Sequence, residues 1–167
     1  MKKNMVFFLL MAVMPFVAYE QTEKEPTPPY LKNPVIPSFN VYTSPDSILF
    51  TKEDLPKGKP VVIIYFSPDC GHCQYEAKEI VKNMKSLSNA FFLWVGFRSL
   101  AEINEFAKKF ELDKFNNVKL SRDPKYFIPS FFKVEFTPFI AIYNTKGVFK
   151  KEFRTGVKTE ELIEIIK

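Results

Sequence analysis

The sequence is most informative at residues 61–73, which read VVIIYFSPDCGHC. The first six residues are apolar and mostly β-branched or aromatic, which is typical of a central strand buried on both faces of a mainly parallel sheet. This predicted strand runs directly into a Cys-x-x-Cys motif. Apolar residues then recur at helical spacing, which predicts an amphipathic helix over residues 73–88. The predicted local order is strand, cysteine loop, helix.

The following segments extend this order into a β-α-β unit. Residues 91–97 predict a second buried strand, and the crossover between the two strands should be right-handed. Ser99 and Glu102 form a capping box that should start a second helix. The Asp-Pro pair at residues 123–124 predicts the N-cap and first position of a short helix, which Pro129 should end.

The last third of the chain predicts a β-hairpin and a closing helix. Residues 139–143 and 148–153 are two strand-like segments, separated by a four-residue turn that ends in glycine. A helix should follow from Thr159, with two glutamates in its first turn and Leu162, Ile163 and Ile166 facing inward. The whole chain therefore predicts an α/β fold in which a β-α-β half precedes a β-β-α half.

Both cysteines of the chain, Cys70 and Cys73, lie in this one motif. A structural zinc site needs about four ligands, and the only histidine is His72, so a zinc site is not predicted. A structural disulfide across two intervening residues would constrain little of the unfolded chain. A Cys-x-x-Cys between a buried strand and a helix instead indicates thiol-disulfide exchange, which needs no organic cofactor.

The predicted position of the motif assigns different roles to the two thiols. A helix N-terminus stabilises a thiolate, so Cys70 is the predicted nucleophile. Cys73, one helical turn further on, would resolve the mixed disulfide. A protonated His72 would favour the Cys70 thiolate, whereas the negative charge of Asp69 would oppose it.

The N-terminal residues predict export. Lys2 and Lys3 precede an apolar run that ends at Ala18, which is the layout of a secretory signal. Residues 1–18 are therefore interpreted as a signal peptide or, if uncleaved, as an N-terminal anchor, and the predicted location is the periplasm. Residues 19–35 are rich in proline and predict a linker. Residues 36–167 are the predicted folded domain.

Composition supports one soluble domain with a mixed-charge surface. The chain has 167 residues, of which 46% are hydrophobic and 26% are charged, as in ordinary globular domains. The net charge of +5 comes from scattered basic residues, so nucleic-acid binding is not predicted.

Together these features resemble the thioredoxin superfamily, and within it the exported TlpA-like and ResA-like thiol-disulfide oxidoreductases. The resemblance covers residues 36–167 and rests on four features: IPSF at residues 36–39 with KGKP at 57–60, the CGHC motif, Glu76, and Thr137-Pro138 before a strand. It implies a thioredoxin-like fold, a central mixed sheet flanked by helices with an N-terminal extension. It also implies a cis Pro138 with Thr137 beside the cysteines, and a role for Glu76 in proton transfer.

The sequence departs from this family at three places. The buried acid that thioredoxin places six residues before the first cysteine is replaced by Ile64. The tryptophan common before the first cysteine is replaced by Asp69. The Gly71-His72 pair is typical of disulfide isomerases, so the resemblance leaves the direction of electron flow open.

The predicted function is disulfide exchange with protein thiols or disulfides outside the cytoplasm. A reductase in that oxidising compartment implies an electron donor in the inner membrane. Two alternatives stay open. A peroxiredoxin would share the fold, and Ser67 matches its hydroxyl position, although Ile63 stands where that family has proline. A copper-binding module would use both thiolates and His72.

Overall fold

The computed structural model describes residues 27–167, which form a seven-stranded mixed sheet with helices on both faces. The strand order is β2-β1-β5-β4-β3-β6-β7. The strands are β1 (Asn40–Thr43), β2 (Leu49–Thr51), β3 (Val61–Phe66), β4 (Phe91–Gly96), β5 (Val118–Arg122), β6 (Phe139–Tyr143) and β7 (Phe149–Phe153). The α-helices are α1 (Pro29–Lys32), α2 (Gly71–Lys82), α3 (Met84–Leu87), α4 (Leu100–Lys109), α5 (Phe127–Phe132) and α6 (Thr159–Ile166).

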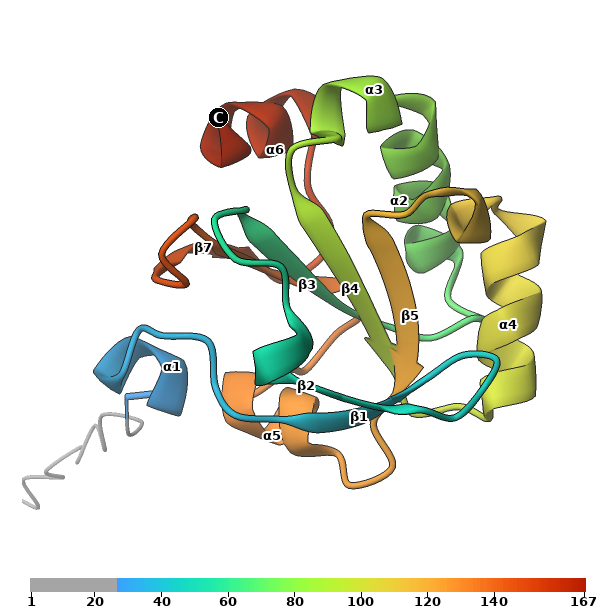
Figure 1. The fold of residues 1–167 in the computed structure, drawn as a ribbon, viewed down its shortest axis with the longest axis horizontal. Coiled ribbons are helices and arrows are strands. Elements are labelled where there is room, and N and C mark those ends of the chain that lie inside the picture. The colour runs from blue at the N-terminus through green and yellow to red at the C-terminus, as the bar shows by residue number, and fades with distance from the viewer. Residues whose placement is uncertain (1–26) are drawn as a thin grey trace, which may run out of the picture.

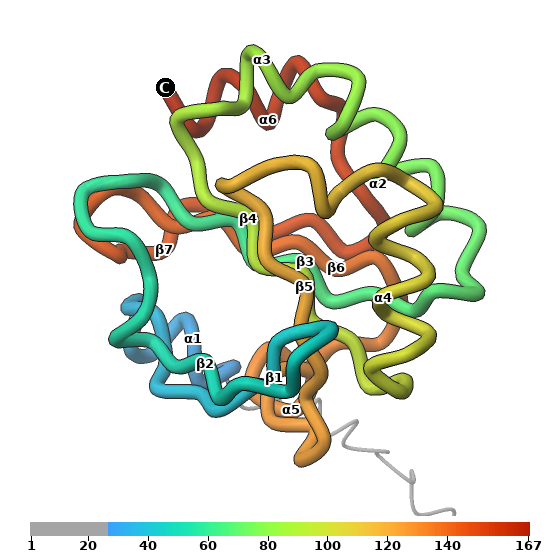
Figure 2. Tube along the Cα trace, turned by 45° about the vertical axis from the view of Figure 1, so that its right-hand side comes forward, coloured from blue at the N-terminus to red at the C-terminus, as the bar shows by residue number. Residues whose placement is uncertain are grey.

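The predicted central strand is β3, and all six of its residues are buried. It pairs in parallel with β4 and antiparallel with β6, with Val62 opposite both Phe92 and Ile142. Because successive side chains of a strand point to opposite faces, alternate residues of β3 pack into two separate hydrophobic cores. Val62, Ile64 and Phe66 pack with α2, α4 and α6, whereas Val61, Ile63 and Tyr65 pack with α1 and α5. Figures 1 and 2 show these two helical layers.

Several predicted elements are confirmed with small changes of boundary. The helix expected over residues 73–88 is broken at Asn83, whose side-chain amide donates to the carbonyl of Glu79 at 2.9 Å. The Ser99–Glu102 capping box is present at the start of α4. The predicted hairpin is β6 and β7, and the closing helix is α6, in which Leu162 and Ile166 are buried.

The short helix predicted from the Asp-Pro pair was placed wrongly. Helix α5 begins at Phe127, after Tyr126 in a left-handed conformation, and Pro129 lies inside its first turn. Asp123 is not its N-cap, although its buried carboxylate accepts hydrogen bonds from the N–H groups of Lys125 and Ile128. Proline is tolerated in a first turn because N–H groups there have no partner within the helix.

Three strands were not predicted from the sequence, namely β1, β2 and β5. Strand β5 lies parallel to β4 and continues the β-α-β unit. It carries a buried polar residue, Ser121, whose hydroxyl donates to the carbonyl of Trp94 at 3.1 Å. The alternation of Val118 and Leu120 with polar residues was the period-2 signal for this strand.

The packed chain starts before Ile36, within the segment predicted as a linker. Tyr30 of α1 is buried, and its ring lies 5.2 Å from that of Phe132. Its hydroxyl accepts a hydrogen bond from Arg154 at 3.2 Å. One large aromatic side chain thus fixes this proline-rich stretch to the domain. The predicted signal peptide, residues 1–18, lies outside the described residues, and no helix within residues 27–167 has the length and hydrophobicity to cross a membrane.

Candidate active site

The CGHC motif lies where β3 ends and α2 begins, as predicted. Cys70 is the N-cap of α2, and its backbone N–H donates to the carbonyl of Ser67 at 3.1 Å. Gly71 opens the helix, and a side chain there would meet open space. The first cysteine therefore sits on a helix N-terminus with an uncovered approach beside it.

Hydrogen bonds hold the sulfur of Cys70. Its thiol donates to the carbonyl oxygen of Thr137 at 3.3 Å, and its Sγ accepts from the backbone N–H of Cys73 at 3.4 Å. Partial burial raises the pKa of this thiol, but hydrogen bonds from the Cys73 side chain and backbone, together with the contact to Thr137, outweigh burial and leave the pKa below its ordinary value of 9.0.

Cys73 has the opposite environment. Its side chain is fully buried in the core cluster beside α4 and α6, and both cysteines are free thiols. Burial, followed by its hydrogen bond to Cys70, raises the pKa of the Cys73 thiol to about 12. One accessible thiol with a lowered pKa is thus paired with a buried thiol that holds its proton.

The bond between Thr137 and Pro138 is cis, as the family resemblance implied. These residues lie on the loop between α5 and β6, which the antiparallel pairing of β6 with β3 brings to the end of β3. The sequence separation between Cys70 and Thr137 is 67 residues. The tertiary fold therefore assembles the two halves of this site.

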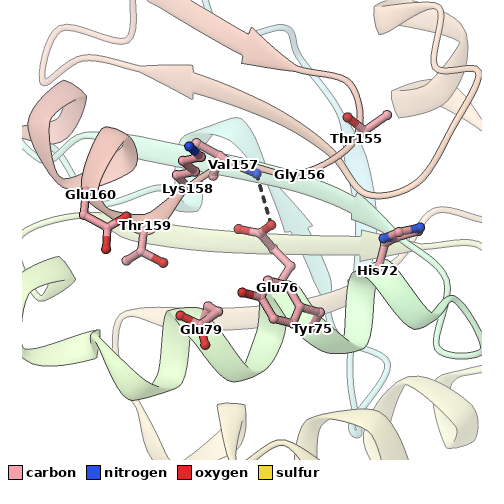
Figure 3. A pocket seen from close by; sticks show the side chains of 10 residues that line it. All are labelled: His72, Tyr75, Glu76, Glu79, Thr155, Gly156, Val157, Lys158, Thr159 and Glu160. Carbon is pink, nitrogen blue, oxygen red and sulfur yellow. Dashed lines mark hydrogen bonds between the residues drawn. The ribbon is translucent and has the colours of Figure 1, made fainter.

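Glu76 is a buried carboxyl group rather than a surface glutamate, with 3% of its area exposed. Its Oε2 accepts from the backbone N–H of Val157 at 3.2 Å, and its Oε1 has no partner. Burial, against the lowering effect of the Val157 hydrogen bond and with a smaller contribution from the charge of Glu79, raises the pKa of Glu76 to about 7. Figure 3 shows Glu76 between α2 and the loop that follows β7.

Gly156 is required where this loop passes Glu76. It has a φ of 102°, which side-chain-bearing residues rarely adopt. A Cβ at this position would lie 2.9 Å from Oε2 of Glu76. The glycine therefore allows the backbone to cover the carboxylate.

Two solved structures from Mycobacterium tuberculosis resemble this chain over most of its length. Mycobacterium tuberculosis DsbF, solved in mixed oxidised and reduced forms, is 25% identical, with a TM-score of 0.65 over 77% of this chain and 92% of that one. A secreted Mycobacterium tuberculosis disulfide oxidoreductase homologous to Escherichia coli DsbE is 20% identical, with a TM-score of 0.64 over 77% and 93%. The chain has a thioredoxin-like fold.

Other comparisons do not assign the chain to one family within the thioredoxin-like fold. A peroxiredoxin-like protein from Aquifex aeolicus is 17% identical, with a TM-score of 0.64 over 79% of this chain and 83% of that one. No family model matches the sequence, and no curated protein matches it. The TlpA-like assignment therefore stays a prediction.

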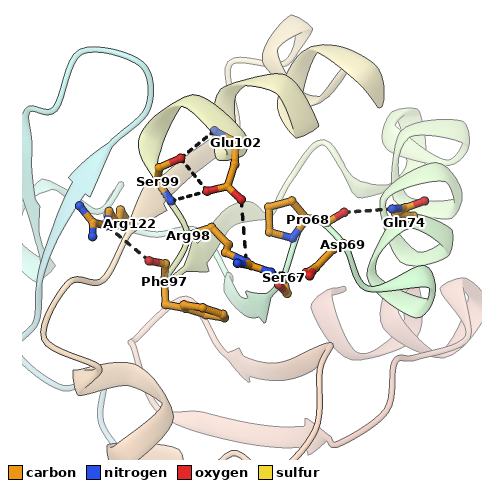
Figure 4. A network of polar contacts seen from close by, with 9 residues as sticks. All are labelled: Ser67, Pro68, Asp69, Gln74, Phe97, Arg98, Ser99, Glu102 and Arg122. Carbon is orange, nitrogen blue, oxygen red and sulfur yellow. Dashed lines mark hydrogen bonds and ion pairs between the residues drawn. The ribbon is translucent and has the colours of Figure 1, made fainter.

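At the rim of the thioredoxin-like site, the negative charge of Asp69 is paired with Arg98, a residue that no sequence pattern indicated. Its carboxylate accepts from the Ser67 hydroxyl and forms an ion pair with Arg98, and these contacts lower the pKa of Asp69. Arg98 also approaches Glu102 at 3.9 Å, so the α4 capping box joins the network (Figure 4). The predicted opposition of Asp69 to the Cys70 thiolate is thereby offset.

The backbone N–H of His72 donates to the Cys70 sulfur and helps to lower the pKa of that thiol. The His72 side chain is exposed on the first turn of α2 and borders the pocket of Figure 3. Ile64, which stands where thioredoxin has its buried acid, is fully buried in β3 and cannot transfer protons. Within residues 27–167, no three His, Cys, Asp or Glu side chains are grouped to hold a metal ion.

Alkylation should distinguish the two thiols. At neutral pH, iodoacetamide is expected to modify Cys70 at least about a hundredfold faster than Cys73, because thiolate is the reactive form and Cys73 is both buried and protonated. Mass spectrometry of digested time points gives both rates. In urea the two rates should converge, and equal rates in the folded protein would contradict the asymmetry.

Proposed function

We propose that this protein is a thiol-disulfide oxidoreductase that exchanges disulfides with protein substrates outside the cytoplasm. The observation that carries the proposal is the asymmetric dithiol: an accessible Cys70 with a lowered pKa and a buried Cys73 whose pKa is about 12. A low-pKa thiol at a helix N-terminus attacks, and a protected neighbour resolves.

In the reducing direction, the Cys70 thiolate attacks one sulfur of a substrate disulfide. A mixed disulfide forms, and the other substrate sulfur leaves as a thiolate that takes up a proton. Cys73 then loses its proton and attacks Sγ of Cys70, which releases the second substrate thiol. Counting the proton that Cys70 released to solvent on becoming a thiolate, the dithiol has given two electrons and two protons to the substrate disulfide, and the reverse sequence oxidises a substrate dithiol.

Glu76 is the proposed acceptor of the Cys73 proton. It lies one helical turn after Cys73, and both side chains are buried on the inner face of α2. Its pKa of about 7 leaves a substantial fraction ionised at neutral pH, which suits a general base. Thr137, whose carbonyl contacts Cys70, is proposed to present the loop backbone to the substrate segment.

The proposed location is the periplasm, as the signal-like residues 1–18 indicate, and one solved thioredoxin-like neighbour is a secreted protein. The reduction potential of the Cys70–Cys73 pair sets the net direction. Acting as a reductase there, the protein needs an electron donor in the inner membrane, since that compartment is oxidising.

A trapping experiment tests the proposal. The Cys73→Ala variant should accumulate mixed disulfides between Cys70 and substrate proteins, because the resolving thiol is missing. Affinity purification from periplasm under alkylating conditions, followed by mass spectrometry with and without reductant, identifies them. The Cys70→Ala/Cys73→Ala double variant is the control. A folded single variant that traps no protein would refute the proposal, and rapid hydrogen peroxide consumption with an empty trap would favour a peroxidase.

A further inference from the structure

A pocket lies directly beside the cysteine motif, between α2 and the loop that joins β7 to α6 (Figure 3). Its volume is about 400 Å³. One wall starts at His72, the residue before Cys73, and continues along α2, while residues 155–160 form the other wall. A substrate segment bound at Cys70 would therefore pass the mouth of this pocket.

Three carboxylates line the pocket, and they come from both walls. Glu76 and Glu79 lie on α2, and Glu160 lies in the first turn of α6. Glu79 approaches Lys82 at 3.9 Å, and no lysine or arginine within residues 27–167 forms an ion pair with Glu76 or Glu160. Lys158 is the one lysine or arginine in the lining, so the ionised glutamates outnumber it and the pocket attracts a cation.

The floor of the pocket holds an unsatisfied acceptor. Only 3% of the surface of Glu76 is exposed, and its Oε1 has no hydrogen-bond partner. Figure 3 shows that the Glu76 oxygen without a dashed line is directed toward the side on which Thr159 and Glu160 lie. A buried carboxylate oxygen without a partner is costly, and a cation close to it would offset that cost.

We propose that this pocket binds a lysine or arginine side chain that lies close to the reacting cysteine of the protein substrate. The inference rests on the proposed function and names its substrate class, polypeptides with a basic residue next to the exchanged disulfide. The long apolar stem of such a side chain packs along Val157 and the exposed ring of Tyr75, while its charged head faces the glutamates.

Matched peptide disulfides test this preference. Each peptide carries one cysteine blocked as a mixed disulfide with 2-mercaptoethanol, and one lysine is moved along the positions flanking that cysteine. Glutamine and glutamate peptides of the same design serve for comparison. At the best position, the lysine peptide should be reduced with a kcat/KM about fivefold above that of the glutamine peptide at low salt. The preference should shrink at high ionic strength.

Charge-changing variants assign the preference to the pocket. In the Glu79→Gln/Glu160→Gln double variant, the lysine-to-glutamine ratio should fall toward one. Lys158→Gln should raise that ratio, because it removes the competing cation. Glu164→Gln is the matched control, since this exposed glutamate of α6 lies outside the pocket and its loss should leave the ratio unchanged. Opposite signs for the two kinds of pocket variant would not arise from a general loss of structure.

The outcomes separate this inference from the proposed function. Efficient reduction of all peptides without a lysine preference, or a preference that survives in the double variant, would overturn the cationic subsite and leave the oxidoreductase standing. If no peptide is reduced, the proposed function fails, and the subsite is then tested by peptide binding alone. A cysteine-free lysine peptide should then still bind more tightly than its glutamine counterpart, and equal dissociation constants would overturn it.

Discussion

Replacement of Cys70 by serine is expected to lower the rate of disulfide exchange by at least about a thousandfold. Serine preserves the size of the side chain and its ability to cap α2, but its hydroxyl cannot form a disulfide. The lowered pKa of Cys70 and its contact with Thr137 are of use only with sulfur at this position. The rate is measured as reduction of a fluorescent peptide disulfide by the reduced protein.

The Cys73→Ser variant is the comparison for this experiment. It keeps the attacking thiol, so a stoichiometric burst of mixed-disulfide formation should precede a stop in turnover. The Cys70→Ser variant should give neither burst nor turnover, with a circular dichroism spectrum like that of the parent protein. Residual exchange at near-parent rates in Cys70→Ser would assign the chemistry to Cys73 and reverse the proposed roles.

Replacement of Glu76 by glutamine is expected to stabilise the fold at alkaline pH while slowing exchange. The pKa of Glu76 is about 7 in the folded protein against an ordinary value of 4.5. Relative to a carboxyl group whose pKa does not change on folding, Glu76 contributes its full stabilisation below pH 4.5. This contribution is lost as the pH rises through about 7. At about 1.4 kcal/mol per pH unit, the loss amounts to about 3 kcal/mol.

Glutamine resembles the protonated acid and does not titrate. The unfolding free energy of Glu76→Gln, relative to the parent protein, should therefore rise by about 3 kcal/mol between about pH 4 and about pH 8. Urea unfolding at several pH values measures this change. Glu164→Gln, an exposed substitution on α6, should show no such pH dependence. A flat difference for Glu76→Gln would mean that Glu76 ionises freely in the folded state.

The same variant should slow the resolving step by about tenfold or more, because it lacks a proton acceptor near Cys73. Single-turnover decay of a preformed mixed disulfide isolates that step. A more stable yet slower enzyme is the signature of a residue kept for chemistry at a cost in stability. A variant that gains stability and keeps its rate would remove Glu76 from the proposed proton transfer.

Sequence patterns were sufficient where burial or local hydrogen bonding decides structure. The run at residues 61–66 predicted β3 because it is short and mostly β-branched or aromatic, as is typical of a strand covered on both faces. The Ser99–Glu102 box predicted the start of α4 because both partners of its hydrogen bonds lie within three residues.

Patterns failed where distant residues decide structure. Strand β5 is held by pairing with β4 and β1, and its polar residues conceal it from a search for apolar runs. The Asp-Pro pair gave a wrong helix start because the chain does not become helical directly after Asp123. Tyr126 first adopts a left-handed conformation, and the Asp123 carboxylate then accepts from the N–H of Ile128. Tyr30 could not be distinguished from a linker residue without the aromatic rings that cover it.

The sequence by itself determined that two thiols stand one helical turn apart at a helix N-terminus, since a strand, a short loop and an amphipathic helix are local features. Only the tertiary structure decided what surrounds those thiols. It placed the Thr137 carbonyl 3.3 Å from Cys70, covered Glu76 with Gly156 and Val157, and paired Asp69 with Arg98. These environments set the pKa values, and they arise from contacts between segments that only the folded sheet brings together.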